Sequence, residues 1–540
     1  MARRALLIVL VLLALAWVRP YVPGFATANE YARLYATLAL AEQGTARLDG
    51  VFDRLAPGWR ERGAPPNSDV AVVGGSYYLD KAPLPSLLAV PFHWAMRLAF
   101  DPWAHPDWEL GLLTALFGGL PLLVFLGLAV RRDASPAPSR AEGAVDASAL
   151  LLAVGSPVLV YAGLWFGHLT AGLVAYAGYA LLKRERPFWG GLLLGAAVLC
   201  DYPAAAVSGT VLGVHALTRR PDRGLLLAVG GFGLAALVQV LYNAAVFGDP
   251  LTFAYAHKAA PEFQRVHAAG VMGVTWPTWE RLGGILLSPQ RGLLFVAPLF
   301  VAALPGAVLA TREGGLPWRE RLLPLALLLA VPPAIAGFVD WRAGNCFGPR
   351  HLVSLLPFVV GPAAAAVERV ASSPRVALRA LPLALGTVGV ATTWLAWSTF
   401  PWLSTDLANP VFHQALPLFL DGCRAPAWLT VPDAAVTPVT LAIPLLVVVA
   451  AGEWLGQGLP GRARAGLTAV GLAVGLLAAA ALAVPGAREP GEAAVAAREA
   501  AMVQSLRACP PTTTARDLAA ALAPEPVPEA SPEPPVEDAP

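Results

Sequence analysis

Two short stretches near the start of the chain carry the side chains best suited to chemistry. The first is Asn29-Glu30-Tyr31, which follows an apolar run, and the second is the segment 77–83, which contains Asp80 and Lys81. A glutamate held partly out of water has a raised pKa and can accept a proton from a hydroxyl or an amine. A lysine offers a compact cation to a phosphate or carboxylate. The pattern predicts a base at Glu30, with Asp80 as the alternative, and an anion contact at Lys81. The plainer interpretation of Glu30 is an acidic residue that stabilises a helix start, with Asn29 as its N-cap.

A second polar cluster lies in the middle of the chain. The segment 341–351 holds Arg342, Arg350 and His351 among glycines, and Arg291 follows Ser-Pro-Gln at 288–290. Arginines and a histidine around glycines at a helix start predict an anion-binding site. The structural alternative is a turn whose Arg350 contacts lipid headgroups.

The composition excludes an ordinary soluble domain. The chain has 540 residues, of which 56% are hydrophobic and 14% charged, against about 25% charged in globular proteins. We therefore predict an all-α polytopic membrane protein. Because 38 basic residues nearly balance 36 acidic ones, the charge gives no indication of nucleic-acid binding.

The N-terminal segment is open to two interpretations. Arg3-Arg4 followed by an apolar run to Val18 resembles a secretory signal, and Ala26-Thr27-Ala28 resembles a cleavage site. Many apolar stretches follow this run, which favours a retained first helix.

Apolar runs predict about thirteen membrane-spanning helices at roughly 20 residues each. They lie near residues 5–22, 108–130, 148–166, 168–183, 188–200, 203–217, 224–247, 291–311, 322–338, 352–368, 380–400, 438–458 and 465–485. They form one transmembrane domain, 1–486. The remaining segment, 487–540, contains a short predicted helix up to Arg507 and ends in a Pro/Glu-rich run with the composition of disorder.

The apolar stretch 83–100 decides the topology. If it lies flat on the outer membrane surface, six basic loops all face the cytoplasm, as expected from the excess of Lys and Arg in cytoplasmic loops. The N-terminus is then cytoplasmic, the C-terminus extracytoplasmic, and 23–107 is a large first extracytoplasmic loop that carries the interfacial helix 83–100. We expect the protein in a plasma membrane, the inner membrane of a bacterium.

This topology brings unusual polar residues to the outer membrane boundary. Charges near hydrocarbon are costly, so we expect these side chains to line one polar cavity or to pair; the alternative is that each reaches into the headgroups. The residues are Glu30, Asp80, Lys81, His168, Asp201, Asn243, His257, Arg291, Asp340, Arg342, Arg350 and His351.

Several common functional motifs are missing. The sequence has no Walker loop, no H-E-x-x-H, no G-x-S-x-G and no haem attachment motif, which argues against an ATP-driven pump and a standard hydrolase. We assign no cofactor and no metal ligands, and leave a metal requirement open. Of the four cysteines, Cys346, Cys423 and Cys509 face outward, and Cys423–Cys509 is the predicted disulfide.

The chain resembles bacterial members of the GT-C glycosyltransferase superfamily, which includes protein O-mannosyltransferases and lipid A aminoarabinose transferases. The resemblance covers residues 5–400. In the first loop it rests on Asn29-Glu30-Tyr31 and on Tyr78-Leu79-Asp80-Lys81-Ala82-Pro83-Leu84, which is similar to the family's Lys-Pro-Pro loop. Further matches are Phe166-Gly167-His168, Asp201-Tyr202-Pro203, Tyr242-Asn243, Phe247-Gly248-Asp249-Pro250, Ser288-Pro289-Gln290-Arg291-Gly292 and Gly348-Pro349-Arg350-His351.

The resemblance implies sugar transfer from a polyprenyl-phosphate donor to a lipid, glycan or protein on the outer face of the membrane. Glu30 would take the base role, Lys81 would contact the donor phosphate, and Arg350, with Arg342 or Arg291, would help to neutralise it. His168 and His351 belong to the same expected substrate site. The family's acidic pair is Asn29-Glu30 here, and its Lys-Pro-Pro is Lys81-Ala82-Pro83.

Two other functions remain open at this point. A transporter or flippase of lipid-linked sugars would carry charged or broken spans at mid-membrane depth, whereas the charges here gather at one face. A non-catalytic envelope assembly protein could use the Pro/Glu-rich tail as its contact.

Overall fold

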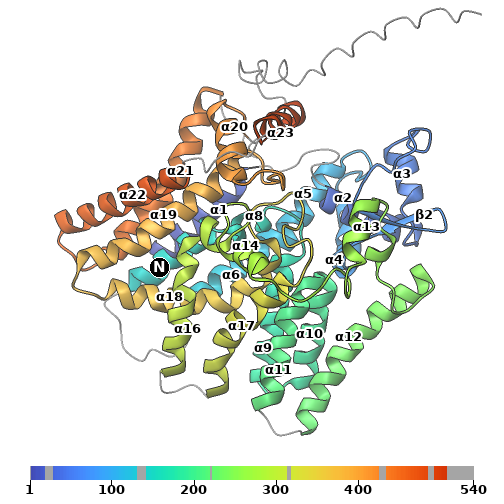
Figure 1. Ribbon diagram of the computed structural model, residues 1–540, viewed down its shortest axis with the longest axis horizontal. Helices are drawn as coiled ribbons and strands as arrows, with labels where there is room; N and C mark the ends of the chain where they lie inside the picture. Colours follow the sequence, from blue (N-terminus) through green and yellow to red (C-terminus); the bar gives the residue numbers. More distant parts are fainter. Residues whose placement is uncertain are drawn as a thin grey trace, which may run out of the picture.

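The computed structural model describes residues 2–18, 28–130, 142–218, 222–312, 318–424, 433–483 and 492–507. These residues are mostly helical, in agreement with the predicted all-α membrane protein, and a single two-stranded hairpin interrupts the pattern. In Figure 1 the elements α2, α3, β2 and α13 lie together at one end, while α16, α17, α11 and α12 extend away from them. The expected disorder after Arg507 and the predicted Cys509 contact lie outside the described residues.

Six helical stretches within the described residues are long and apolar enough to cross a membrane. They are Pro106–Ala129, Arg223–Phe247, Arg350–Ala371, Val376–Ser398, Val436–Leu455 and Gly461–Ala483. Large apolar side chains on three helices face outward. Leu226 and Leu241 of Arg223–Phe247, Leu329 of Trp318–Ala336 and Leu477 of Gly461–Ala483 are 61–74% exposed. Outward-facing leucines suit a lipid environment, so the chain has the character of a membrane protein. The count of thirteen spans stays a prediction.

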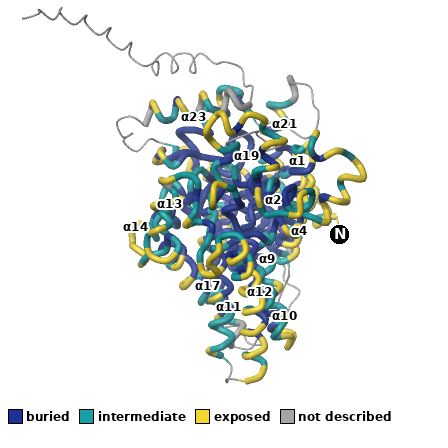
Figure 2. Tube along the Cα trace, turned by 90° about the vertical axis from the view of Figure 1, so that its right-hand side faces the viewer, coloured by how far each residue is buried: buried dark blue, intermediate teal, exposed yellow. Residues whose placement is uncertain are grey.

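Most helices of the bundle begin and end within a few residues of the predicted apolar runs. The single helices are α9 (His168–Lys183), α10 (Pro187–Cys200), α11 (Ala205–Thr218), α12 (Arg223–Phe247), α16 (Ala303–Arg312), α17 (Trp318–Ala336), α18 (Leu356–Ala371), α19 (Val376–Ser398), α21 (Asp433–Leu455) and α22 (Gly461–Ala483). The segment Pro106–Ala129 consists of α5 (Pro106–Thr114), η2 (Ala115–Gly119) and α6 (Leu120–Ala129). Figure 2 shows the buried residues concentrated in the middle of this bundle.

Two predicted spans are broken. The run 148–166 divides into α7 (Glu142–Val154) and α8 (Pro157–Ala162), because Ser156 caps the second helix by accepting a hydrogen bond from the Val158 amide and Pro157 suits a first helical position. The run 291–311 divides into α15 (Leu293–Val296), η5 (Pro298–Ala302) and α16. Pro298 has no amide hydrogen with which to continue α15. The prediction of one continuous helix was therefore wrong in both places.

The first helix, α1 (Ala2–Ala16), packs against the bundle along one face. Its Arg3 forms an ion pair with the buried Asp146 on α7. The Trp17 indole donates to Thr440 Oγ1 at 2.9 Å, and the Trp397 indole donates to the Ala14 carbonyl at 3.1 Å. Contacts with helices so distant in sequence make α1 a structural part of the bundle.

The first loop contains α2 (Ala28–Gln43), α3 (Asp49–Leu55), a hairpin of β1 (Val70–Val73) and β2 (Ser76–Leu79), and α4 (Leu84–Met96). The hairpin was not predicted. Gly74 and Gly75 have φ of 57° and 79° and form its two-residue turn. The register pairs Val70 with Leu79, and it therefore places Asp69 and Asp80 next to each other at the open end of the hairpin.

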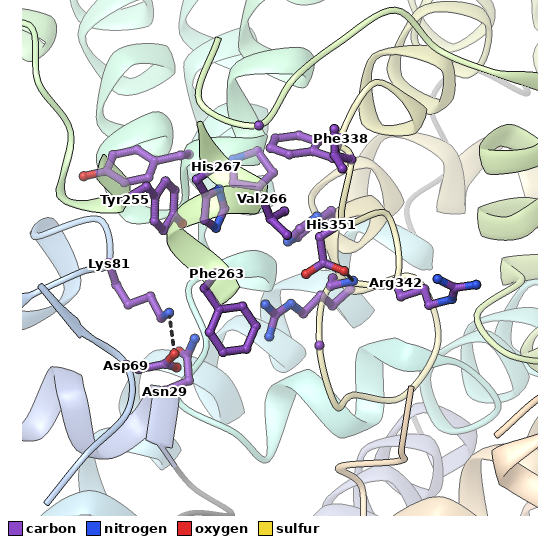
Figure 3. A pocket seen from close by; sticks show the side chains of 18 of the residues that line it. Asn29, Asp69, Lys81, Tyr255, Phe263, Val266, His267, Phe338, Arg342 and His351 are labelled. Carbon is purple, nitrogen blue, oxygen red and sulfur yellow. Dashed lines mark hydrogen bonds and ion pairs between the residues drawn. The ribbon is translucent and has the colours of Figure 1, made fainter. Parts of the chain in front are cut away.

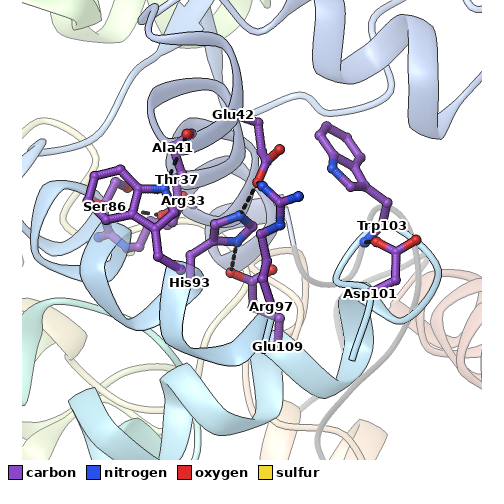
Figure 4. A network of polar contacts seen from close by, with 11 residues as sticks. Arg33, Thr37, Ala41, Glu42, Ser86, His93, Arg97, Asp101, Trp103 and Glu109 are labelled. Atoms are coloured by element: carbon purple, nitrogen blue, oxygen red, sulfur yellow. Dashed lines mark hydrogen bonds and ion pairs between the residues drawn. The ribbon is translucent and has the colours of Figure 1, made fainter. Parts of the chain in front are cut away.

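Helix α4 occupies most of the stretch predicted as an interfacial helix. Its 13 residues extend about 20 Å, less than the ~30 Å of a hydrocarbon core. His93 of α4 contacts Glu109 of α5 through Nδ1 at 2.8 Å and Glu42 of α2 through Nε2 at 2.7 Å. Figure 4 shows His93 between the two carboxylates. This contact fastens α4 to its two neighbours, and its position at the membrane surface stays a prediction.

Four short helices complete the side on which the first loop lies. They are α13 (Pro261–His267), α14 (Trp279–Leu287), α20 (Leu416–Leu420) and α23 (Glu492–Arg507). The predicted helix ending at Arg507 is thus present as α23. It lies beside α20 (Figure 1), and its Arg498 pairs with Asp406 at 3.3 Å.

Candidate functional site: a charged cavity beside the first loop

A cavity of about 1090 Å³ lies between the first loop and the ends of several helices. Its walls come from segments far apart in the sequence, from Ala28 to Met502. In Figure 3 Asn29, Asp69 and Lys81 lie on one side and Arg342 and His351 on the other, with Phe263 between them. Large apolar side chains cover much of the rest, namely Phe166, Val198, Phe253, Val274, Ile335, Phe338, Phe400 and Trp402.

Four charged side chains form a cluster at one wall. Lys81 Nζ lies 3.0 Å from Asp69 Oδ1 and 3.1 Å from Asp80 Oδ1. Lys258 Nζ lies 2.7 Å from Asp80 Oδ2 and 3.7 Å from Asp69 Oδ1. The hairpin register brings the two aspartates together, and the loop after α12 supplies Lys258. Asp69, Lys81 and Lys258 line the cavity, and Asp80 is fully buried behind them.

The charges in this cluster shift the pKa values of Asp69, Lys81 and Lys258. Burial alone would raise the pKa of Asp69, but the ammonium groups of Lys81 and Lys258 outweigh burial and hold that pKa well below its usual range. Burial also lowers the pKa of Lys81 despite the aspartates. For Lys258, Asp80 and Asp69 outweigh burial and raise the pKa. We therefore describe the cluster as two aspartates paired with two lysines, in which the two ammonium groups keep Asp69 ionised.

Arg350 and His351 bring positive charge and imidazole to the same cavity. Both line it, and the guanidinium of Arg350 lies 5.8 Å from the centre of the Phe166 ring. The buried Arg350 Nε and His351 Nδ1 have no hydrogen-bond partner in the protein. A buried polar atom without a partner costs on the order of 1–3 kcal/mol, and a polar ligand that reached these two atoms would recover that cost.

His168 lies behind His351, outside the cavity. Its Nδ1 is 2.6 Å from Asp201 Oδ2, and its ring centre is 5.8 Å from that of His351. His168 is only 4% exposed and does not line the cavity.

Glu30, the predicted base, lies away from the cavity wall. Its side chain is 3% exposed, and its Oε1 accepts a hydrogen bond from the Trp165 amide at 2.9 Å. Burial raises the pKa of Glu30 to about 8, although the Trp165 amide and Arg33 partly oppose the rise. The neighbouring Asn29 lines the cavity instead. Asn29 lies inside the first turn of α2, which begins at Ala28.

Arg291 has a structural position. Its guanidinium is fully buried and donates to the carbonyls of Arg342, Gln290, Gly344 and Leu403 at 2.9–3.1 Å. These bonds hold the polar 341–351 segment in place. Arg342 lines the cavity and donates from Nε to Gln290 Oε1 at 2.7 Å.

The polar residues that were predicted to lie at the outer membrane boundary do not all line one cavity. Asp340 lines the cavity, whereas Asn243 bonds to Gln239 and the Pro250 carbonyl, and His257 stacks on Phe247.

Sequence reasoning missed Asp69 and Lys258. Asp69 had a usable signal, since Gly74-Gly75 between two β-rich runs predicts a hairpin that would place it beside Asp80. No sequence signal pointed to Lys258, because its aspartate partners are far away in the sequence.

No group of three or more His, Cys, Asp or Glu side chains among the described residues is arranged to hold a metal ion. Cys200 and Cys346 are buried free thiols, and Cys423 is in a disulfide. Compared with known proteins, the chain matches no family model and no curated sequence.

Proposed function

We propose that this protein is a membrane glycosyltransferase that moves a sugar from a polyprenyl-phosphate donor to a lipid, glycan or protein acceptor. The observation that carries the proposal is the largely apolar cavity that Lys81, Lys258 and Arg350 all line. The donor that suits such a wall has an anionic phosphate and a long apolar tail. Its partners are accordingly the lipid-linked sugar and the surrounding membrane lipids, and no cofactor is assigned.

The charge balance supports a phosphate at this position. Lys81 and Lys258 share two aspartates. A donor phosphate can take the place of Asp69 at both ammonium groups, because Asp69 lines the cavity whereas Asp80 is fully buried. Cations held in this way stabilise the negative charge that develops on the leaving phosphate.

Arg350 has a donor nitrogen that is free to bind, which also supports a phosphate in this cavity. Its Nε is buried and unpartnered, and a guanidinium forms strong bonds with phosphate oxygens. Arg342 is a second arginine on the opposite side of the cavity from Lys81 (Figure 3). We assign Lys81, Lys258 and Arg350 to the phosphate, and we exclude Arg291 because backbone carbonyls occupy its donors.

The test is a deletion strain of the source organism examined by mass spectrometry of its envelope lipids, glycans and glycoproteins. We expect one sugar modification to be lost and to return with the wild-type gene. Lys258→Gln should restore less than a tenth of it. Arg265→Gln, a change on α13 at a residue that does not line the cavity, should restore it fully.

Purified protein in nanodiscs adds a direct measurement. A polyprenyl phosphate should bind at least tenfold more tightly than the neutral polyprenol, and Lys258→Gln should abolish that difference. Translocation of a lipid-linked sugar with its sugar–phosphate bond intact would instead identify a transporter. Unchanged envelope chemistry in the deletion strain would contradict the proposal.

A further inference from the structure

Sugar transfer to a hydroxyl requires a group that accepts its proton, and the carboxylates at the cavity are already engaged. Among the described lining residues, Asp69 pairs with two lysines and Asp406 pairs with Arg498. Asp340 accepts a hydrogen bond from the Ala343 amide at 3.1 Å. Glu30 does not reach the cavity wall. The proton acceptor must therefore be sought among other side chains.

His351 lines the cavity and has a nitrogen without a structural role. It follows Arg350 at the start of η6 (Arg350–Leu355). Its Nδ1 is buried and has no hydrogen-bond partner in the protein. Its ring contacts aromatic neighbours on two sides, with Phe338 at 5.4 Å and His168 at 5.8 Å between ring centres. Packing holds this imidazole in position while its hydrogen-bonding capacity stays unused.

His168 and Asp201 form a pair behind His351. The carboxylate of Asp201 can only accept when ionised, so the 2.6 Å contact assigns the proton to His168 Nδ1. His168 Nε2 then carries the lone pair, and it too is buried and unpartnered. An aspartate that holds a histidine in one tautomer is a common arrangement for supporting proton transfer.

The geometry points to His351 as the catalytic base of the proposed transfer, with His168 and Asp201 as positioning residues. This inference rests on the proposed function. The acceptor hydroxyl oxygen attacks the anomeric carbon, and the bond from that carbon to the phosphate oxygen breaks with its electron pair going to the phosphate. The hydroxyl proton passes to the His351 imidazole. The imidazolium then returns the proton to the departing polyprenyl phosphate or to water.

The charges around His351 fit a base that is neutral at rest and protonated only briefly. Arg350 is adjacent in sequence, His267 lines the same cavity, and His168 lies in ring contact. Asp201, through its bond to His168, is the nearby anion that stabilises an imidazolium once formed. A proton held next to the Arg350 guanidinium leaves readily, which allows turnover.

The experiment uses membranes of the deletion strain that carry single variants and the natural donor and acceptor. His351→Asn should lower kcat at least 100-fold with little change in KM. Added imidazole should restore part of the rate, because a free imidazole can occupy the space and accept the proton. His105→Asn changes an exposed histidine stacked on Trp108, and it should match the wild type in both kcat and KM.

The positioning residues have their own readout. Asp201→Asn should lower kcat about tenfold and move the acid limb of the kcat/KM profile to lower pH, because the imidazolium loses its nearby anion. His168→Asn should also lower kcat, and added imidazole should not rescue it. A merely structural defect would leave the pH limb where it is in the wild type.

The outcomes separate the two proposals. A wild type without any transfer overturns the proposed function, and this inference with it. A His351→Asn variant that keeps more than a third of wild-type kcat overturns only the base assignment. The same holds for a variant that loses activity and polyprenyl-phosphate binding together, since that result indicates misfolding or a binding role.

Discussion

Buried acidic residues in this protein are accommodated in two different ways. Asp69 stays ionised because the ammonium groups of Lys81 and Lys258 face it. Glu30 has only a backbone amide and a nearby arginine, and burial raises its pKa to about 8. At neutral pH Glu30 is therefore mostly protonated, so α2 begins with a neutral side chain.

Glu30→Gln tests this protonation state. The folded-state pKa of about 8 exceeds the unfolded value of 4.5, so the folded protein binds a proton that the unfolded chain has released. Wild-type stability should therefore fall as pH rises from 4.5 to 8, by up to about 1.4 kcal/mol per pH unit. Glutamine should remove this fall, as measured by thermal unfolding between pH 5 and 9.

The same variant separates two candidate bases. Glutamine keeps an oxygen that can accept from the Trp165 amide, so transfer activity should persist if His351 is the base. A loss of 100-fold or more would return the base role to Glu30, as the family resemblance implies.

Helix packing depends on glycines at close contacts. A Cβ at Gly231 of α12 would lie 2.1 Å from the Phe188 carbonyl oxygen, and one at Gly191 of α10 would lie 1.8 Å from the Ala228 carbonyl oxygen. Small residues let membrane helices approach in this way. The two helices can pack closely only while both positions lack a side chain.

Gly231→Ala and Gly230→Ala form a matched pair. Alanine at 231 must push α12 from α10 and should cost about 1–3 kcal/mol. Alanine at 230 meets no atom within 4 Å and should gain up to about 1 kcal/mol of helix propensity. Thermal unfolding in detergent should therefore shift in opposite directions, and equal shifts would contradict the packing.

The contact of His93 with Glu42 and Glu109 should make the first loop sensitive to pH. Burial opposes protonation, but the two carboxylates outweigh it and raise the pKa of His93 above 6.5. The stabilisation is thus complete below pH 6.5 and is lost as pH rises through the raised value. Limited proteolysis should cut near α4 faster at pH 9 than at pH 6.

His93→Leu should make that cleavage fast at both pH values. It leaves the buried Glu109 without its partner, a change that costs about 3–5 kcal/mol for a buried pair, whereas Glu42 keeps its ion pair with Arg97. Equal cleavage of the wild type at both pH values would show that His93 does not control the loop.

Local patterns predicted helices well and long-range contacts poorly. Hydropathy located α12, α19 and α22 to within a few residues, because each apolar run is long and uninterrupted. It failed at Ser156-Pro157, where capping divides a run that hydropathy treats as continuous. Lys81 and Arg350 were expected at the site and line the cavity. Lys258 could not be expected, since its pairing with Asp80 depends on how distant loops pack.

At the scale of the whole molecule, the state of each cysteine indicates which side of the membrane it faces and how tightly it is packed. Cys423 was predicted to face outward and is in a disulfide, which suits an oxidising side of the membrane. Cys200 and Cys346 are 1% and 2% exposed free thiols.

Alkylation followed by peptide mapping tests this arrangement. Cys200 and Cys346 should react only after denaturation, and Cys423 only after reduction as well. Labelling of Cys423 without a reductant would contradict the disulfide and weaken the topology.

The cavity wall runs from Ala28 near the start of the chain to Met502 on α23. A ribosome must therefore synthesise nearly all of the described chain before the last part of the wall exists. While the early helices enter the membrane, the nascent chain still lacks Lys258, Arg350 and Met502. The protein thus completes this cavity only at the end of its synthesis, and fragments released early would lack the phosphate site proposed above.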